Sequence, residues 1–297
     1  MYVGAVPGPR TTEGLLLLGF LRAKQKLGID GQVLYVSPAQ DPTGLLETLA
    51  RRQFDLIVVA FPDPAPVDVV ARAFPRARFL MVDIPLQALD HRPHNVEGSI
   101  FRAEDAGYLA GYLAASMERR RAGPNVISAV GGQSYPGVDR WIVGYRAGAK
   151  HADPHVSIRV GYSGDFVDPT KCRRIALAQI AAGSGVVFDV AGDCGLGALA
   201  AAKAKSVWGI GVDEDQAFLG SHILTSAVIH LDTGMYRSIE RFTRGRLPTG
   251  GNEVFDLRNG GVSLGHISPR VPASILRRLE AVRKAILAGS INVPHLT

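Results

Sequence analysis

The chain has 297 residues, of which 46% are hydrophobic and 20% are charged. This length suits one large domain or two smaller ones, and the composition excludes an intrinsically disordered protein. The net charge of +6 comes from scattered arginines with one short basic run at 119–121, which excludes a basic arm for nucleic acid. No apolar run approaches the roughly 20 residues that a membrane-spanning helix needs.

The first part of the chain alternates between predicted strands and predicted helices. Short apolar runs indicate buried strands, and apolar residues at helical spacing indicate helices. The run at 56–60 is apolar throughout, as expected for a parallel strand covered on both faces. The predicted strands are 3–6, 32–36, 56–60, 78–83 and a short segment at 96–101, and the predicted helices are 14–27, 42–52, 67–74 and 104–120.

A break at Gly123-Pro124 restarts the same alternation. Two sets of βα units joined near this break predict an α/β fold with two doubly wound parallel-sheet lobes, of the periplasmic-binding-protein type. The second set has predicted strands at 125–130, 157–162, 186–190, 207–212 and 222–229, and predicted helices at 138–151, 170–182 and 196–205.

The remaining tail is too short for a third domain, so it must pack on one of the lobes. It contains a predicted helix at 233–244, a strand-like run at 254–257, and Asn259-Gly260, which signals a hairpin-type turn. A final helix is predicted at 272–288. We therefore expect an N-terminal lobe of residues 1–122 with about 232–256, and a C-terminal lobe of 123–231 with about 257–297.

The sequence also bears on the compartment. Met1 leads directly into a strand-like run without a basic region or a cleavage site, so the chain is expected to be a cytosolic protein or a mature domain without its leader. Cys172 and Cys194 are not spaced as a zinc or redox motif. A disulfide between them would indicate an oxidising compartment, and two buried free thiols are the alternative.

Motifs for catalysis are missing from the sequence. It has no glycine-rich dinucleotide or phosphate loop and no nucleophile elbow. His151 and His155 have the spacing of a helical metal pair, but Pro154 lies between them, so we predict no metal site and no cofactor.

Instead, polar and aromatic residues follow the predicted strands. Asp213 ends the strand at 207–212, and the carboxyl ends of strands in an open parallel sheet line the ligand crevice. A carboxylate there can accept hydrogen bonds from two neighbouring hydroxyls, although Asp213 could instead cap the next helix. Phe61, Tyr135 and Phe166 also lie close to strand ends, which suits a flat heterocycle bearing hydroxyls.

Several segments resemble the basic membrane protein family of ABC-transporter substrate-binding proteins, which is related to the bacterial purine nucleoside receptor. The similarity spans nearly the whole chain, and the segments follow one another in family order. They are 101–115 (FRAEDAGYLAGYLAA), Gly131-Gly132, 144–149 (GYRAGA), Phe166 with Asp168-Pro169, 191–197 (AGDCGLG), 211–216 (GVDEDQ), 224–228 (LTSAV) and 286–294 (ILAGSINVP).

The resemblance implies a purine nucleoside bound between two lobes that close on it. Asp213 matches the family's ribose-binding aspartate, Phe166 the aromatic residue that stacks on the base, and Gly192 the loop whose backbone approaches the ligand, next to Asp193. It also implies a permease partner, a monomer and an extracytoplasmic location, either secreted or anchored to the membrane, with membrane contact only through a lipid anchor.

Two positions depart from the family pattern. The first loop reads Pro9-Arg10-Thr11-Thr12-Glu13 where the family has an Asp and a Phe-Asn pair, and Ile229 replaces a common lysine. Thr12 and Glu13 are the residues placed to substitute as polar contacts. These departures keep a free nucleobase or another small polar solute open as the ligand.

We weigh three classes of function. A solute receptor that serves an ABC importer ranks first. An enzyme using Asp213 and Asp193 as acid and base ranks lower, because no nucleophile or metal stands between them. A ligand-sensing regulator ranks last, because no DNA-binding helix-turn-helix precedes the first strand.

Overall fold

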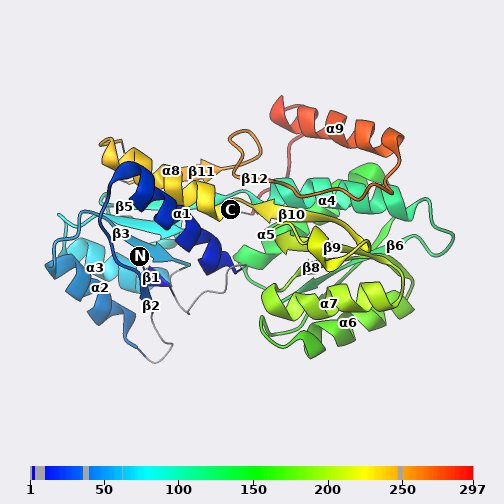
Figure 1. Ribbon diagram of the computed structural model, residues 1–297, viewed down its shortest axis with the longest axis horizontal. Helices are drawn as coiled ribbons and strands as arrows, with labels where there is room; N and C mark the ends of the chain where they lie inside the picture. Colours follow the sequence, from blue (N-terminus) through cyan, green and yellow to red (C-terminus); the bar gives the residue numbers. More distant parts are fainter. Residues whose placement is uncertain (1, 4–10, 36–39, 62, 247–249, 297) are drawn as a thin grey trace. The chain divides into compact units, whose positions relative to one another are not determined.

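The computed structural model describes residues 2–3, 11–35, 40–61, 63–246 and 250–296. The chain forms two compact units, which are described separately below. Unit 1 contains residues 1–101 and 231–255, and unit 2 contains residues 102–230 and 256–297 (Figure 1).

Unit 1 is built on a sheet of six parallel strands in the order β11-β5-β4-β3-β1-β2. Helices α1 and α8 pack together on one face of the sheet, and α2 and α3 cover the other (Figure 1). The strands are β1 Tyr2–Val3, β2 Leu34–Tyr35, β3 Ile57–Ala60, β4 Phe79–Val82, β5 Val96–Phe101 and β11 Asn252–Phe255. The helices are α1 Thr12–Leu27, α2 Pro42–Arg51, α3 Pro64–Ala73, the 3-10 helix η1 Leu86–Ala88, and α8 Leu231–Thr243.

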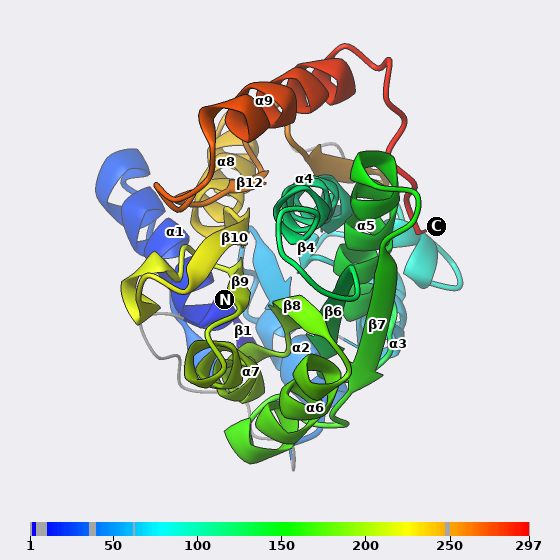
Figure 2. The same cartoon turned by 90° about the vertical axis from the view of Figure 1, so that its right-hand side faces the viewer.

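Unit 2 has the corresponding strand order, β12-β10-β9-β8-β6-β7, with β12 antiparallel to its neighbour β10. Helices α6 and α7 lie on one face of this sheet and α4 and α5 on the other, with α9 packed on α4 (Figure 2). The strands are β6 Val126–Gly131, β7 Ser157–Tyr162, β8 Ser184–Val190, β9 Trp208–Asp213, β10 Ile223–Ile229 and β12 Val262–Leu264. The helices are α4 Ala103–Glu118, α5 Pro136–Ala152, α6 Pro169–Ala181, α7 Gly192–Ala204, the 3-10 helix η2 Ala217–Leu219, and α9 Ala273–Leu287.

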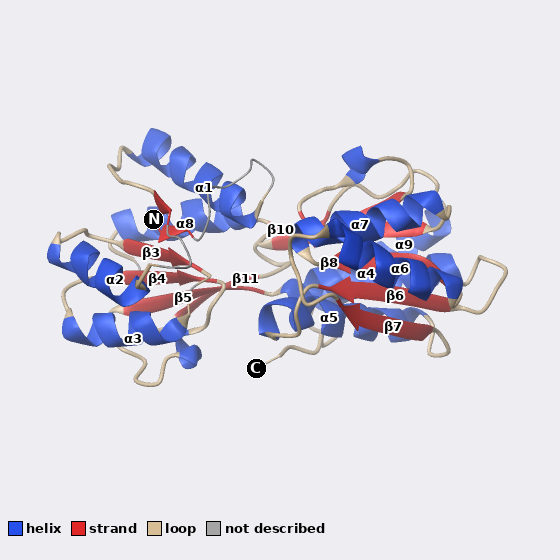
Figure 3. Cartoon of the chain, turned by 90° about the horizontal axis from the view of Figure 1, so that it is seen from below, coloured by secondary structure: helices blue, strands red, loops and turns tan. Residues whose placement is uncertain are grey.

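The predicted α/β class with two parallel-sheet lobes is confirmed. Within each sheet the parallel strands end at the same edge (Figure 3). Both sheets reverse their strand order once, between β1 and β3 in unit 1 and between β6 and β8 in unit 2. Ligands of open α/β sheets bind outside the carboxyl ends of the strands at such a reversal.

The expected boundary at residue 122 is wrong, because helix α4 belongs to unit 2 and the chain leaves unit 1 after Phe101. Glycines explain how α4 and α5 pack so closely. A Cβ at Gly111 would overlap the carbonyl oxygen of Tyr145, and a Cβ at Gly148 would overlap that of Tyr108. Helices in such close contact form one core, and this core lies in unit 2.

The hairpin expected around Asn259-Gly260 is also wrong. Strand β11 pairs with β5 in unit 1, and its Phe255 stacks on Phe101 with ring centroids 4.8 Å apart. Strand β12 pairs with β10 in unit 2. The Asn259 side chain instead closes a local turn by accepting from the backbone N–H of Asp256 at 2.9 Å.

Across the described ranges, every helix is too short or too polar to cross a bilayer.

Candidate ligand-binding site

Asp213 is the last residue of β9 and has a left-handed backbone, with φ +66°. The N–H of Glu214 donates to the carbonyl of Val212 at 2.8 Å, which closes a tight turn around Asp213. The next helical element, η2, has Gln216 at its cap position, so the interpretation of Asp213 as a helix cap is wrong. Left-handed backbone is uncommon outside glycine and is often found at functional positions.

Phe166 lies at the point where the strand order of unit 2 reverses. Gly132 follows β6, and its N–H donates to Val190 at the end of β8. A Cβ at Gly132 would overlap the Phe166 ring, and a Cβ at Gly192 would lie 3.3 Å from the Phe166 carbonyl oxygen. The ring is therefore seated over the carboxyl ends of β6 and β8.

The loop that carries Phe166 is held by its own polar residues. The Asp165 carboxylate accepts from the backbone N–H groups of Val167 at 2.7 Å and Asp168 at 3.0 Å, and it pairs with Lys171 at 2.6 Å. The hydrogen bond from Lys171, followed by those from the backbone, holds the pKa of Asp165 well below its usual range. Asp168 caps helix α6 by accepting from Thr170 at 2.9 Å. These two carboxylates shape the loop.

Tyr135 adds a second aromatic side chain at this edge. It is 49% exposed, and its ring meets the Phe166 ring edge to face, with centroids 6.1 Å apart and planes at 81°. Tyr135 stands at the cap position of α5, and the exposed Asp193 stands in the first turn of α7. The structure thus gathers Asp213, Phe166, Gly192, Asp193 and Tyr135 at the carboxyl edge of one sheet.

Asp189 is a candidate that sequence reasoning missed. It is completely buried on β8, and one carboxyl oxygen accepts from the N–H of Ala191 at 2.9 Å. The other oxygen has no partner among the described residues. Burial raises the pKa of Asp189 well above its usual range. The hydrogen bond from Ala191 lowers this pKa, and the nearby carboxylates of Asp213 and Asp193 raise it. The only signal in the sequence is an acid within the apolar run 186–190.

The remaining predicted residues belong to unit 1. Thr12 and Glu13 start helix α1, and the Thr12 hydroxyl donates to Glu13 at 3.0 Å. Phe61 follows β3 with a φ of +47° and is 38% exposed. Asp83 occupies the equivalent position after β4 with a φ of +60°, which the sequence pattern did not single out. The rest of the predicted first strand and of the loop after it, residues 4–10, lies outside the described residues.

Cys172 and Cys194 form a disulfide with their Cα atoms 5.6 Å apart, so the alternative of two free thiols is wrong. Among the described residues, no group of His, Cys, Asp or Glu side chains is arranged to hold a metal ion. His151, which has the spacing of a helical metal ligand with His155, instead pairs with the Tyr108 hydroxyl at 2.7 Å.

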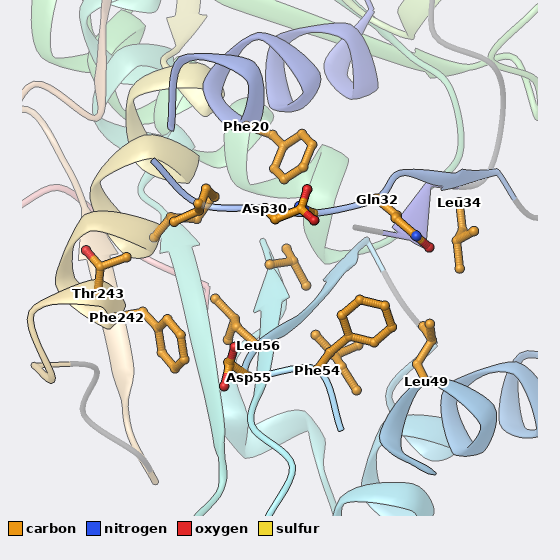
Figure 4. A pocket seen from close by; sticks show the side chains of 15 residues that line it. Phe20, Asp30, Gln32, Leu34, Leu49, Phe54, Asp55, Leu56, Phe242 and Thr243 are labelled. Carbon is orange, nitrogen blue, oxygen red and sulfur yellow. The ribbon is translucent and has the colours of Figure 1, made fainter. Parts of the chain in front are cut away.

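Unit 1 also contains a mostly apolar cavity of about 260 Å³ (Figure 4). Helices α1 and α8 and the amino ends of β2 and β3 line it, through side chains such as Phe20, Phe54 and Phe242. None of the described residues lining it is a predicted site residue. The cavity lies at the amino ends of the strands, whereas the candidate ligand residues follow their carboxyl ends.

The fold is that of the periplasmic-binding-protein-like ABC solute-binding proteins. An ABC transporter solute-binding protein from Aeropyrum pernix K1 matches with a TM-score of 0.83 and 23% identity, over 99% of this chain and 93% of that one. A family model described as ABC transporter substrate-binding protein PnrA-like matches residues 15–297, and the chain belongs to this family, Bmp.

Two relatives have descriptive names. The ABC transporter nucleoside-binding protein BmpA of Lactococcus lactis is 29% identical over 275 residues, which cover 86% of this chain and 76% of that protein. Basic membrane protein A of Borreliella burgdorferi is 31% identical over 287 residues, which cover 94% of this chain and 82% of that protein. The protein is thus the extracytoplasmic substrate-binding component of an ABC system, with a small-molecule ligand and a permease partner, and it is not an enzyme.

Proposed function

We propose that the solute is a nucleoside, with a preference for purine nucleosides, and that this protein delivers it to its ABC permease. The observation that carries the proposal is the placement of Phe166 and Asp213 on one sheet edge. Phe166 is seated over the strand reversal, and Asp213 ends the strand next to β8. An aromatic ring and a carboxylate match the flat base and the sugar hydroxyls of a nucleoside.

Different residues bind the base and the sugar of the ligand. Phe166 stacks on the base, with Tyr135 bracing its ring from the side. Asp213 accepts hydrogen bonds from the ribose hydroxyls. Gly192 and Asp193, in the first turn of α7, also contact the sugar. Thr12, Glu13 and Phe61 of unit 1 stay predictions from the sequence. The nucleoside-binding relative in Lactococcus lactis supports the same ligand class.

A thermal-shift and calorimetry panel tests the ligand class. It compares guanosine, inosine, adenosine, cytidine and uridine with the matching free bases and with ribose. At least one nucleoside should raise the melting temperature, because a ligand that binds only the folded state stabilises it by mass action. A panel without any binding nucleoside would refute the proposal.

The second candidate ligand is a free nucleobase, which is favoured by the first loop of the chain. Residues 9–13 read PRTTE and lack the family's usual base contacts. Equal affinities for guanine and guanosine would select this candidate, because the sugar would then contribute nothing.

We also propose that the protein is a monomer outside the cytoplasm, which is either secreted or held on the outer face of the membrane by a lipid anchor. Light scattering during gel filtration tests the oligomeric state. Fatty-acid labelling of the protein in its native host tests the anchor.

A further inference from the structure

The Cys172–Cys194 disulfide lies beside the loop that carries Phe166. Cys172 is in the first turns of α6, and Cys194 is in the first turn of α7. Both cysteines are fully buried. The loop at 163–168 leads into α6, so the disulfide joins the helix that follows this loop to the helix that carries Gly192 and Asp193.

Cys194 contacts the loop directly at two points. Its backbone N–H donates to the carbonyl of Phe166 at 3.0 Å. Its sulfur lies 3.5 Å from the Ser163 hydroxyl, which itself donates to the carbonyl of Asp165 at 2.7 Å. One residue therefore fixes both the backbone of Phe166 and the start of its loop, and the disulfide holds that residue against α6.

The other contacts hold the loop to the end of β6 and to α6. The backbone N–H groups of Ser163 and Gly164 donate to the carbonyls of Gly131 at 2.9 Å and Gly132 at 2.8 Å. Asp165 pairs with Lys171, and Asp168 caps α6, so both tie the loop to that helix alone. Attachment to α7 depends on the Cys194 contacts, on the apolar packing of α6 against α7, which includes Gly197 against Pro169, and on the disulfide. Without the covalent link, the first turn of α7 can separate from the loop more easily.

We propose that this disulfide is a positioning element of the ligand site, so that ligand affinity depends on its oxidation state. This inference rests on the proposed nucleoside site. A dithiol would supply two electrons and two protons: the S–S bond breaks, two S–H bonds form, and the dithiol closes into its own disulfide. The reduced protein keeps its fold but holds Phe166, Gly192 and Asp193 less firmly against one another.

The test compares the wild type with the double variant Cys172→Ala/Cys194→Ala. Guanosine and inosine affinities are measured by calorimetry at a temperature where circular dichroism shows both proteins fully folded. We expect an affinity about tenfold lower in the variant, which corresponds to about 1.4 kcal/mol. Wild type reduced with dithiothreitol, with free thiols counted by Ellman's reagent, should show the same loss.

A matched variant separates positioning from general stability. Leu279→Ala removes a buried side chain from α9 and is expected to lower the melting temperature without changing nucleoside affinity. If the double variant has a lower melting temperature but binds both nucleosides like the wild type, the disulfide only stabilises the fold and the inference is overturned.

Hydrogen exchange in the ligand-free proteins separates this inference from the proposed function. Amides in 163–168 and 192–195 should exchange faster in the double variant than in the wild type, and the Leu279→Ala variant should not show this local change. Unchanged exchange would overturn the inference even if nucleosides bind. A wild type that binds no nucleoside, with faster local exchange in the double variant, would instead overturn the ligand assignment alone.

Discussion

The ring of Phe166 lies so close to Gly132 that a methyl group at this glycine would overlap the ring. The glycine directly follows β6, and its N–H donates to the carbonyl of Val190 at 3.0 Å. The absence of a side chain at Gly132 therefore lets the ring lie on the strand reversal, which is where the base of the proposed nucleoside would stack.

Substitution Gly132→Ala should displace the Phe166 ring and weaken nucleoside binding at least about tenfold, or about 1.4 kcal/mol. The melting temperature should change little, because the half-buried ring can move toward solvent. Calorimetry with guanosine measures the effect. Gly251→Ala serves as the control, since a Cβ there meets no described atom within 4 Å. Equal affinity in both variants would show that the ring position does not matter.

Substitution Gly111→Ala should destabilise unit 2, because the added methyl group overlaps the Tyr145 carbonyl on the facing helix. Overpacking of this kind costs about 1–3 kcal/mol of unfolding free energy, sometimes more. Urea unfolding followed by circular dichroism measures the change. Ser116→Ala, at a half-buried position of the same helix, should stay close to the wild type. A loss for Gly111→Ala no larger than that of the control would contradict the close packing of α4 and α5.

The stability of unit 1 should depend on pH through Glu97. This residue is completely buried and pairs with Arg241 at 3.2 Å, and Arg241 also pairs with Glu253 at 2.6 Å. Burial raises the pKa of Glu97 from 4.5 to about 7, although Arg241 lowers it. The folded-state pKa is above the unfolded one. The contribution of Glu97 to the free energy of unfolding is therefore fully present below pH 4.5 and is lost as the pH rises to about 7.

Glu97→Gln should remove this dependence, because the amide does not titrate. The difference in unfolding free energy between variant and wild type should grow between those two pH values. It should reach at most about 3.5 kcal/mol, given a pKa rise from 4.5 to about 7 and about 1.4 kcal/mol per pKa unit. Urea titrations across this range measure the difference. A difference that stays constant with pH would show that Glu97 does not titrate in this window.

Asp189 should destabilise the folded state at neutral pH. Because its pKa is raised in the folded state, its contribution to the free energy of unfolding is fully present below the unfolded pKa of about 3.9. This contribution is lost as the pH rises. Asp189→Asn keeps an acceptor for the Ala191 N–H and cannot ionise. The variant should match the wild type near pH 4 and exceed its unfolding free energy by about 1 kcal/mol or more at pH 7. A less stable variant at pH 7 would indicate that the carboxylate is charged and has a partner.

The sequence pattern predicted that Asp213 and Phe166 lie at one sheet edge, because each stands at the end of a recognisable strand and strand ends in parallel sheets meet there. It could not locate Asp189, because an acid inside a short apolar run looks like an ordinary break in that run. Nor could it exclude a helix cap for Asp213. The cap is excluded by the position of η2, whose cap residue is Gln216, and this position is a tertiary feature.

The unit boundary shows a second limit. Gly123-Pro124 resembles a domain linker, whereas the actual crossing after Phe101 has no glycine or proline to signal it. The assignment of α4 depends on the glycine contacts with α5, and these become evident only when both helices are seen together. Likewise, residues 252–255 belong to the sheet of unit 1 because they pair with β5, which lies more than 150 residues earlier in the chain.

A double-mutant cycle between Asp213 and the ligand's sugar tests the central claim most directly. Calorimetry would measure inosine and 2′,3′-dideoxyinosine against the wild type and Asp213→Ala. We predict that each change alone costs roughly 1.5–3 kcal/mol, as for hydrogen bonds to a charged group. Both changes together should cost little more than either one, because they remove the same contact. Fully additive losses, or an Asp213→Ala variant that binds inosine like the wild type, would contradict the assignment of Asp213 to the sugar.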